Sequence, residues 1–181
     1  MERNMKHSLL TFALIAIFSS NALAWEPDTN DEMELSVAKA IVNARDKDPA
    51  IAKWFDTASA YVVFPRVGKG AVGVGGARGR GLVIQDDATI GRASLTQLSI
   101  GFSLGGQVYS EYIFFRDQTA LDDFKRGNFE LGAQVSAVAL TAGASADANY
   151  SKGVAVFTIA EGGLMYEASG GGQKFKYRDP K

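Results

Sequence analysis

Four cations in a glycine-rich stretch are the residues of this 181-residue chain best suited to binding chemistry. Arg66, Lys69, Arg78 and Arg80 fall within 15 residues, with no acidic residue among them. Glycine allows a ligand to approach the backbone closely, and consecutive N–H groups can form a concave anion site. Arginine adds bidentate hydrogen bonds to phosphate. The stretch therefore predicts contact with the phosphate head groups of lipids. The alternative is that the glycines serve tight strand packing and sharp bends, while the cations are solvated.

The side chains of ordinary enzyme chemistry are scarce. The chain has no cysteine, and its single histidine, His7, lies in an N-terminal segment that we expect to be removed. Thiolate nucleophiles, Ser-His-Asp triads and most zinc sites are therefore excluded from the remainder. The adjacent acids Asp86–Asp87 and Asp122–Asp123 are typical of turns and helix starts. We expect no enzyme activity and no metal, and a hydrolase that uses two carboxylates is the weakest alternative.

One glycine pattern has the form of a nucleotide site. Gly68–Gly73 matches G-x-G-x-x-G, which binds a dinucleotide when a helix follows directly. The residues that follow it, 74–81, are again rich in glycine, and each glycine costs a helix about 1 kcal/mol. We therefore regard the match as accidental and expect no cofactor.

Charge and size place limits on the partner. The 19 basic and 20 acidic residues give a net charge of −1, which does not favour binding to nucleic acid. Attraction to an anionic surface must then come from a local cluster of cations. The length and the 46% hydrophobic content are ordinary for one globular domain.

The N-terminus has the three-part layout of a secretory signal. Arg3 and Lys6 precede the apolar run Leu9–Phe18, and Ala22–Ala24 has the small-x-small form of a cleavage site. A membrane anchor is the alternative, but the run is shorter than the roughly 20 residues of a spanning helix. We predict a signal peptide over residues 1–24, cleavage after Ala24, a periplasmic or secreted location, and a single domain over residues 25–181.

Residues 25–58 are predicted to be helical. Thr29–Glu32 fits a capping box at the start of a first helix, and Asp48–Pro49 is typical of the start of a second. Trp54 and Phe55 follow on an apolar stripe, which favours burial in the core. The alternative is that Trp54 lies at a membrane surface beside a snorkelling lysine.

The rest of the chain has the composition of strands and turns. All 20 glycines lie between Gly68 and Gly172, and the connections are too short for parallel crossovers. We predict an α+β fold in which N-terminal helices pack on a Gly-rich, mainly antiparallel β-sheet or partly closed barrel with one short inserted helix. Turns are expected at residues 86–87 and 105–106. The expected strands are 61–64, 71–84, 98–104, 107–115, 129–140, 154–159, 164–168 and 174–177, and the expected helix is 119–124.

Four ordered blocks resemble the signature of the SYLF lipid-binding domain. They are Tyr61–Gly81, Gly101–Phe115, Gly127–Gln134 and Ser151–Gly153, and the resemblance spans about residues 30–178. It implies a lipid-binding module without catalysis. Eukaryotic relatives associate with phosphoinositide membranes and actin, and bacterial relatives are exported. The lipid preference of the eukaryotic relatives is linked to a basic, amphipathic N-terminal segment. Residues 25–34 of this chain are acidic instead, so phosphoinositide specificity is not implied.

Together these features predict a non-enzymatic lipid- or phospholipid-binding protein of the bacterial cell envelope. The expected contacts to anionic head groups are Arg66, Lys69, Arg78 and Arg80, aided by Trp54. The expected partner is a phospholipid or membrane surface, with an envelope protein as a second partner, and neither nucleic acid nor metal is expected. The alternative is a periplasmic protein–protein interaction module without a lipid ligand, which would pair through exposed strand edges.

Overall fold

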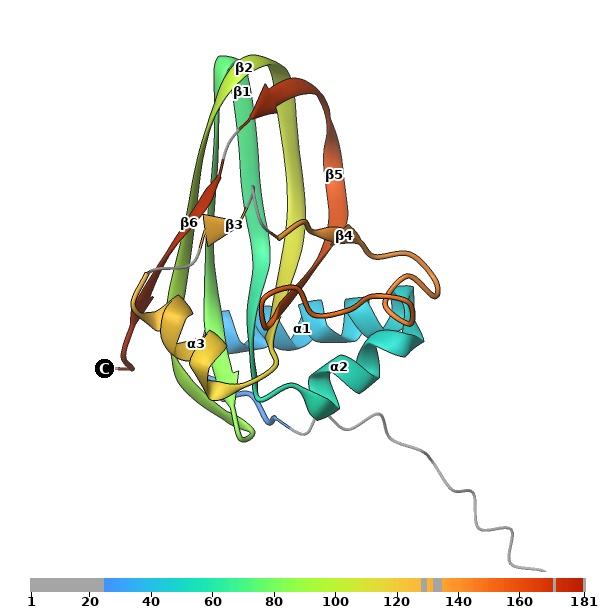
Figure 1. Cartoon of the computed structure of the whole chain (residues 1–181), viewed down its shortest axis with the longest axis vertical. Coiled ribbons are helices and arrows are strands. Elements are labelled where there is room, and N and C mark those ends of the chain that lie inside the picture. Colours follow the sequence, from blue (N-terminus) through green and yellow to red (C-terminus); the bar gives the residue numbers. More distant parts are fainter. Residues whose placement is uncertain (1–24, 128–129, 132–134, 171, 181) are drawn as a thin grey trace, which may run out of the picture.

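The computed structural model describes residues 25–127, 130–131, 135–170 and 172–180 (Figure 1). The predicted signal peptide lies outside the described residues and stays a prediction. No helix in the described part of the chain has the length and apolar character needed to cross a membrane. The elements are α1 (Glu32–Lys47), the short 3-10 helix η1 (Pro49–Ile51), α2 (Ala52–Thr57), β1 (Ala60–Gln85), β2 (Ala88–Phe115), α3 (Gln118–Lys125), β3 (Glu130–Leu131), β4 (Val138–Ala139), β5 (Val154–Gly170) and β6 (Gln173–Arg178).

Side-chain caps fix where the N-terminal helices begin. The carboxylate of Asp31 accepts hydrogen bonds from the backbone N–H groups of Met33 and Glu34, so Asp31 caps α1. The prediction of a helix start in this region is therefore confirmed, but the capping residue is Asp31 and not Thr29, two residues earlier. Asp48 accepts from the N–H of Ala50 and is followed by proline, so the second predicted start is confirmed.

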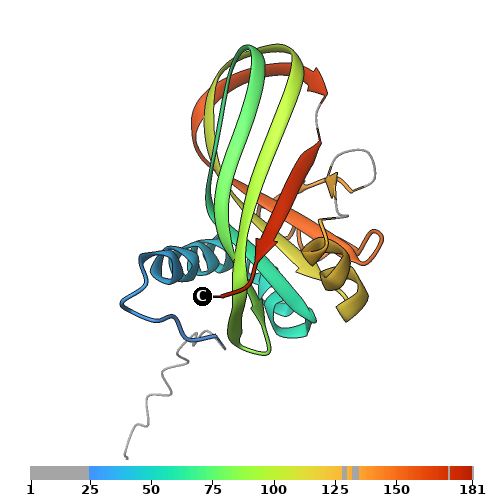
Figure 2. The same cartoon turned by 90° about the vertical axis from the view of Figure 1, so that its left-hand side faces the viewer.

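β1 and β2 form one long antiparallel hairpin. They pair from Ala60 opposite Phe115 to Gln85 opposite Ala88. The predicted turn is confirmed, because Asp86 and Asp87 have φ angles of 49° and 56°. Figure 2 shows that this ribbon rises, arches over and descends, so each strand has two arms.

Two expected strand ends are wrong. The first predicted strand should stop before Pro65, yet β1 continues through it, because the register shifts between Phe64 and Val67 and the proline lies in that irregularity. Residues 105–106 do not form a turn either. Gly105 has a φ of 116°, and β2 stays paired with β1 while the ribbon bends near the arch.

The sheet is open and mainly antiparallel. Its order is β3-β6-β2-β5-β4, with β1 paired to β2. β6 pairs with the first arm of β2 and β5 with its second arm, while β4 runs parallel to β5. The α+β class and the single inserted helix, α3, are confirmed. Residues 154–170 form one strand where two were expected, and the expected strand 129–140 is reduced in its described part to β3 and β4.

Two apolar cores lie on opposite faces of the strands. Helices α1 and α2 cover one face, where Tyr112, Phe114 and Phe157 are buried. Helix α3 covers the inner face of the arch, where Phe115 and Phe175 are buried. We call these the helix-side face and the inner face. Successive side chains of a strand point to opposite faces of the sheet. The position of a residue along its strand therefore decides whether its side chain lies on the helix-side face or on the inner face.

Candidate functional site

A groove of about 1070 Å³ lies on the helix-side face, where the strands extend beyond α1. Its walls come from α1, both arms of β1, both arms of β2, and β5. On β1, Leu82 and Ile84 are buried beneath the helices. Arg78 and Arg80 lie at alternate positions on the same strand, so their side chains point to the same face as Leu82 and Ile84. Both arginines lie beyond the helices, where they are exposed and line the groove.

Three of the predicted contacts meet in this groove. Arg66 comes from the first arm of β1, and Arg78 and Arg80 come from the second arm. Arg78 lies opposite Thr96 in the strand register, and Arg80 lies opposite Ser94, so a hydroxyl accompanies each guanidinium. The site thus offers planar cationic donors and neutral hydroxyls on one surface, which is the chemistry that phosphate oxygens require.

Glycines bring the two arms of β1 into contact. A Cβ atom on Gly79 would lie 2.8 Å from Val67 Cγ2 and 3.4 Å from the carbonyl oxygen of Arg66. On Gly81 it would lie 2.2 Å from the carbonyl oxygen of Val63. These glycines therefore serve close strand packing, as the alternative interpretation held, and that packing places Arg66 beside the other two arginines.

The groove arginines have no partner in the part of the chain that the structure describes. Within the described residues, no hydrogen bond, ion pair or ring contact involves Arg66, Arg78 or Arg80, whereas the arginines of the ion pairs lie elsewhere. Lys39 of α1 is also exposed on the groove wall, and the sequence analysis missed it. The signal was the polar face of α1, since Ser36, Lys39 and Asn43 share one side of the helix.

Two predicted contacts lie outside the groove lining. Lys69 is half-buried on β1 beyond the groove. Trp54 is packed between Tyr150 and Phe157, with ring centroids 4.8 and 5.1 Å away, and its Nε1 donates to the carbonyl oxygen of Ser145 at 3.0 Å. Trp54 thus belongs to the aromatic packing beneath α2, and its contact with a membrane stays a prediction.

One carboxylate shares the groove with the cations. Glu161 of β5 is exposed, and its Oε1 accepts from Asn43 Nδ2 at 3.1 Å and from Ser110 Oγ at 3.0 Å. The hydroxyl of Tyr112 lies 3.1 Å from Ser110 Oγ and donates to the carbonyl oxygen of Ala40 at 2.7 Å. Burial raises the pKa of Tyr112, so the phenol keeps its proton and this polar chain tethers α1 to the sheet.

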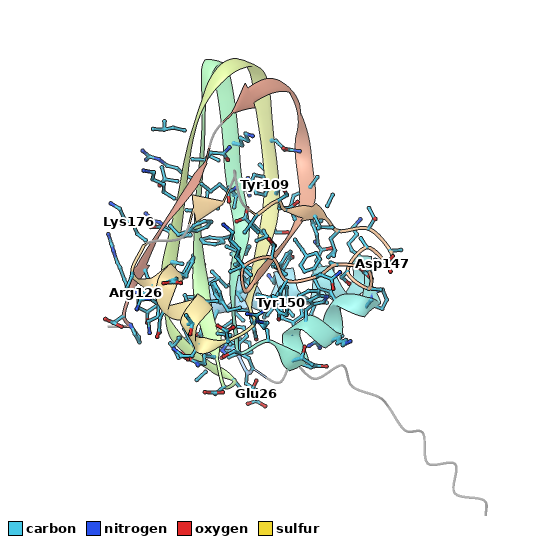
Figure 3. All side chains as sticks on the ribbon, in the orientation of Figure 1. Glu26, Tyr109, Arg126, Asp147, Tyr150 and Lys176 are labelled. Carbon is cyan, nitrogen blue, oxygen red and sulfur yellow. The ribbon has the colours of Figure 1, made fainter. Side chains whose placement is uncertain are left out.

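A second buried polar cluster lies on the inner face. Glu111 is fully buried, and Gln173 Nε2 donates to Glu111 Oε2 at 3.1 Å and to Tyr109 Oη at 3.2 Å. Figure 3 marks Tyr109 in the middle of the molecule. Burial raises the pKa of Glu111 to about 7, and the Gln173 amide opposes that rise. Since Glu111 is fully buried on the inner face, it does not reach a substrate in the groove on the helix-side face. In the described part of the chain, no three His, Cys, Asp or Glu side chains are grouped to hold a metal.

Comparison with known proteins supports the resemblance seen in the sequence. Residues 96–179 match the family described as Ysc84, Las17-binding protein actin regulator. The chain is also 26% identical over 139 residues to Beta cell expansion factor A of Aeromonas veronii, an alignment that covers 75% of this chain and 52% of that protein. The chain therefore spans about half the length of this curated relative. Both findings confirm the resemblance to SYLF domains.

Proposed function

We propose that this chain binds phospholipid at the bacterial cell envelope, because residues 96–179 match the Ysc84 (SYLF) family, whose members are in general lipid-binding and non-enzymatic. Arg66, Arg78 and Arg80 contact the anionic phosphates of the head groups. The protein acts in the periplasm or after secretion, as the N-terminal Leu9–Phe18 run and the Ala22–Ala24 cleavage pattern indicate.

The observation that carries the proposal is the meeting in one groove of three exposed arginines that have no partner among the described residues. Guanidinium groups that are not used within the protein keep all their N–H donors for a ligand. A cleft lined by cations also concentrates the local field, which attracts an anionic surface although the whole chain carries a net charge of −1.

Sedimentation with vesicles tests the proposal. The vesicles contain phosphatidylcholine alone or phosphatidylcholine with phosphatidylglycerol, at low salt. The groove variant carries Arg66→Gln, Arg78→Gln and Arg80→Gln. Each basic residue near an anionic membrane contributes about 1 kcal/mol, so we expect roughly 100-fold weaker binding to the anionic vesicles.

A charge-matched variant provides the control. Arg116→Gln, Arg126→Gln and Arg178→Gln remove the same three charges from exposed positions outside the groove lining. We expect this control to bind nearly as well as the unmodified protein. The proposal is wrong if the unmodified protein does not sediment with anionic vesicles, or if both triple variants lose binding equally.

The open sheet favours a second candidate, a protein-interaction module. The edge strands β3 and β4 have two residues each, so they pair with only part of β6 and β5. A partner chain could add a strand along the remaining edge of β5. A pull-down from envelope extract that recovers one protein in stoichiometric amount, without lipid, would support this candidate over the first.

A further inference from the structure

We infer that the groove selects a zwitterionic head group, in which a phosphate is joined by a short link to a primary ammonium, as in phosphatidylethanolamine. The inference rests on the proposed function and concerns the same groove. Arg66, with Arg78 and Arg80, binds the phosphate, and Glu161 accepts hydrogen bonds from the ammonium.

The strand register places the two charges on opposite sides of one strand. Val67 pairs with Tyr109 of β2, which pairs in turn with Ala160 of β5. Arg66 lies in the irregularity of β1 just before this row, and Glu161 lies in the irregularity of β5 just after it. Neighbouring strands are about 4.8 Å apart, so the backbones of Arg66 and Glu161 are about 10 Å apart across β2.

Both irregularities aim their residues into the groove. An irregularity of this kind inserts an extra residue and re-aims its side chain, and such features are common beside functional sites. Arg66 and Glu161 are both exposed and both line the groove. A guanidinium and a carboxylate that face one groove from two flanking strands leave room between them for a small dipolar group.

Glu161 is held ready to accept a cation. Asn43 and Ser110 both donate to its Oε1, which fixes the orientation of the carboxylate. Among the described residues, no cation lies within ion-pair distance of Glu161, and Oε2 has no hydrogen-bond donor. Four cations line the same groove, yet this carboxylate is left unneutralised. An oriented, exposed and unpaired carboxylate beside a phosphate-binding surface fits the ammonium of the same ligand.

The type of ammonium follows from the donors that a carboxylate needs. A primary ammonium carries three N–H groups, as the lysine side chain does, and can donate to Oε2 of Glu161. A quaternary ammonium has no N–H group and is bound characteristically by aromatic cages, whereas none of the described residues that line the groove is aromatic. A glycerol head group has no positive charge to offset the carboxylate. Between the two zwitterionic head groups, the groove should therefore favour ethanolamine over choline.

The experiment uses three zwitterionic lipids whose head groups differ in the number of N–H groups, with phosphatidylglycerol as an anionic reference. Vesicles of phosphatidylcholine are supplemented with phosphatidylethanolamine, its N,N-dimethyl derivative or phosphatidylglycerol, and binding of the purified protein is measured by flotation. We expect affinity to fall roughly fivefold from the ethanolamine to the choline lipid, with the dimethyl lipid between them. The lipid series tests the inference without any substitution in the protein.

Glu161→Gln tests the role assigned to the carboxylate. Glutamine keeps an oxygen that can accept from Asn43 and Ser110, so the tether to α1 is retained while the charge is lost. We expect the preference for ethanolamine to disappear, with binding to phosphatidylglycerol unchanged or stronger. Asp147→Asn, which removes an exposed carboxylate from the loop marked in Figure 3, should leave the preference intact.

The outcomes separate this inference from the proposed function. Binding to anionic vesicles through the arginines, without preference among the three nitrogen head groups, would overturn the inference and leave the proposed function standing. A preference that persists in Glu161→Gln would overturn it as well. If the protein binds no vesicle of any composition, both the inference and the proposed function are wrong.

Discussion

Replacing Glu111 by glutamine should change how the stability of the protein depends on pH. Glu111 is fully buried on the inner face, and its pKa is about 7 because burial disfavours the charged carboxylate. Two buried oxygens of this cluster, Glu111 Oε1 and Gln173 Oε1, have no hydrogen-bond partner among the described residues. The protonated carboxyl is uncharged, so burial penalises it less than the carboxylate.

The sign and the size of the effect follow from proton linkage. The ordinary pKa of a glutamate side chain is 4.5. Below that pH both the folded and the unfolded chain hold the proton, so the ionisation of Glu111 does not change the free energy of unfolding. Between pH 4.5 and 7 the unfolded chain releases its proton while the folded chain keeps it, so the free energy of unfolding falls as pH rises. One pKa unit corresponds to about 1.4 kcal/mol, and the full loss above pH 7 is therefore about 3 kcal/mol.

Glu111→Gln removes this loss, because the amide is neutral at every pH and has nearly the same shape. We expect the variant to be about 3 kcal/mol more stable than the unmodified protein at pH 8, and of similar stability at pH 4. Urea unfolding followed by far-ultraviolet circular dichroism from pH 4 to pH 8 measures both. Asp123→Asn, at an exposed surface ion pair, is the control and should not alter the pH dependence. The reasoning fails if the two curves of stability against pH are parallel, or if carboxyl NMR shows Glu111 titrating near pH 4.5.

Two further predictions concern the packing that supports the groove. Gly81→Ala should destabilise the protein by about 3 kcal/mol, because the added Cβ would lie 2.2 Å from the carbonyl oxygen of Val63. Gly68→Ala, with nothing within 4 Å of its Cβ position, is the control, and equal melting temperatures for the two variants would contradict the reasoning. Asp48→Ala should cost about 3 kcal/mol in urea unfolding, since three backbone N–H groups lose their acceptor, whereas Asp147→Ala should cost little. Burial alone would raise the pKa of Asp48, but these hydrogen bonds hold it below its ordinary value, so its contribution should be lost as the pH falls through that lowered pKa.

The elements that were predictable from the sequence are those that local interactions define. Asp48–Pro49 begins a helical turn because the cap and the proline act within three residues. Gly127 follows α3 with a φ of 75°, as a glycine after a helix end should. The turn at residues 86–87 likewise depends on its own backbone. Local signals therefore place the ends of helices and hairpins.

The lengths of the strands were not predictable in the same way. Pro65 and Gly105 are strand breakers by local rules, yet both lie inside long strands. Pro65 is tolerated because it lies in an irregularity of β1, and Gly105 because the ribbon bends near it. Whether such a residue ends a strand or bends it depends on the arch as a whole, which is a tertiary property.

The residues of the candidate site also differ in whether local sequence or tertiary structure brings them together. Arg66, Arg78 and Arg80 could be predicted because they lie close together in a short run of sequence. Glu161 and Asn43 could not, since they are 118 residues apart and meet only when β5 pairs with β2 beneath α1. Nothing in the composition around Glu161 distinguishes it from the other surface acids. Sequence proximity thus finds the cationic part of the groove, and tertiary pairing supplies its acidic part.

The two interpretations of the glycine-rich stretch turn out to be complementary. Arg66 and Arg78 are twelve positions apart along β1, and an ordinary strand would place them far from each other. They share one groove because β1 folds back on itself, and the folded arms approach closely only where Gly79 and Gly81 lack a side chain. The same alternation that turns these glycines toward the neighbouring arm turns Arg78 and Arg80 toward solvent. The packing role of the glycines is therefore what assembles the cationic surface, and a substitution that separates the arms would remove the site without touching any of its charged residues.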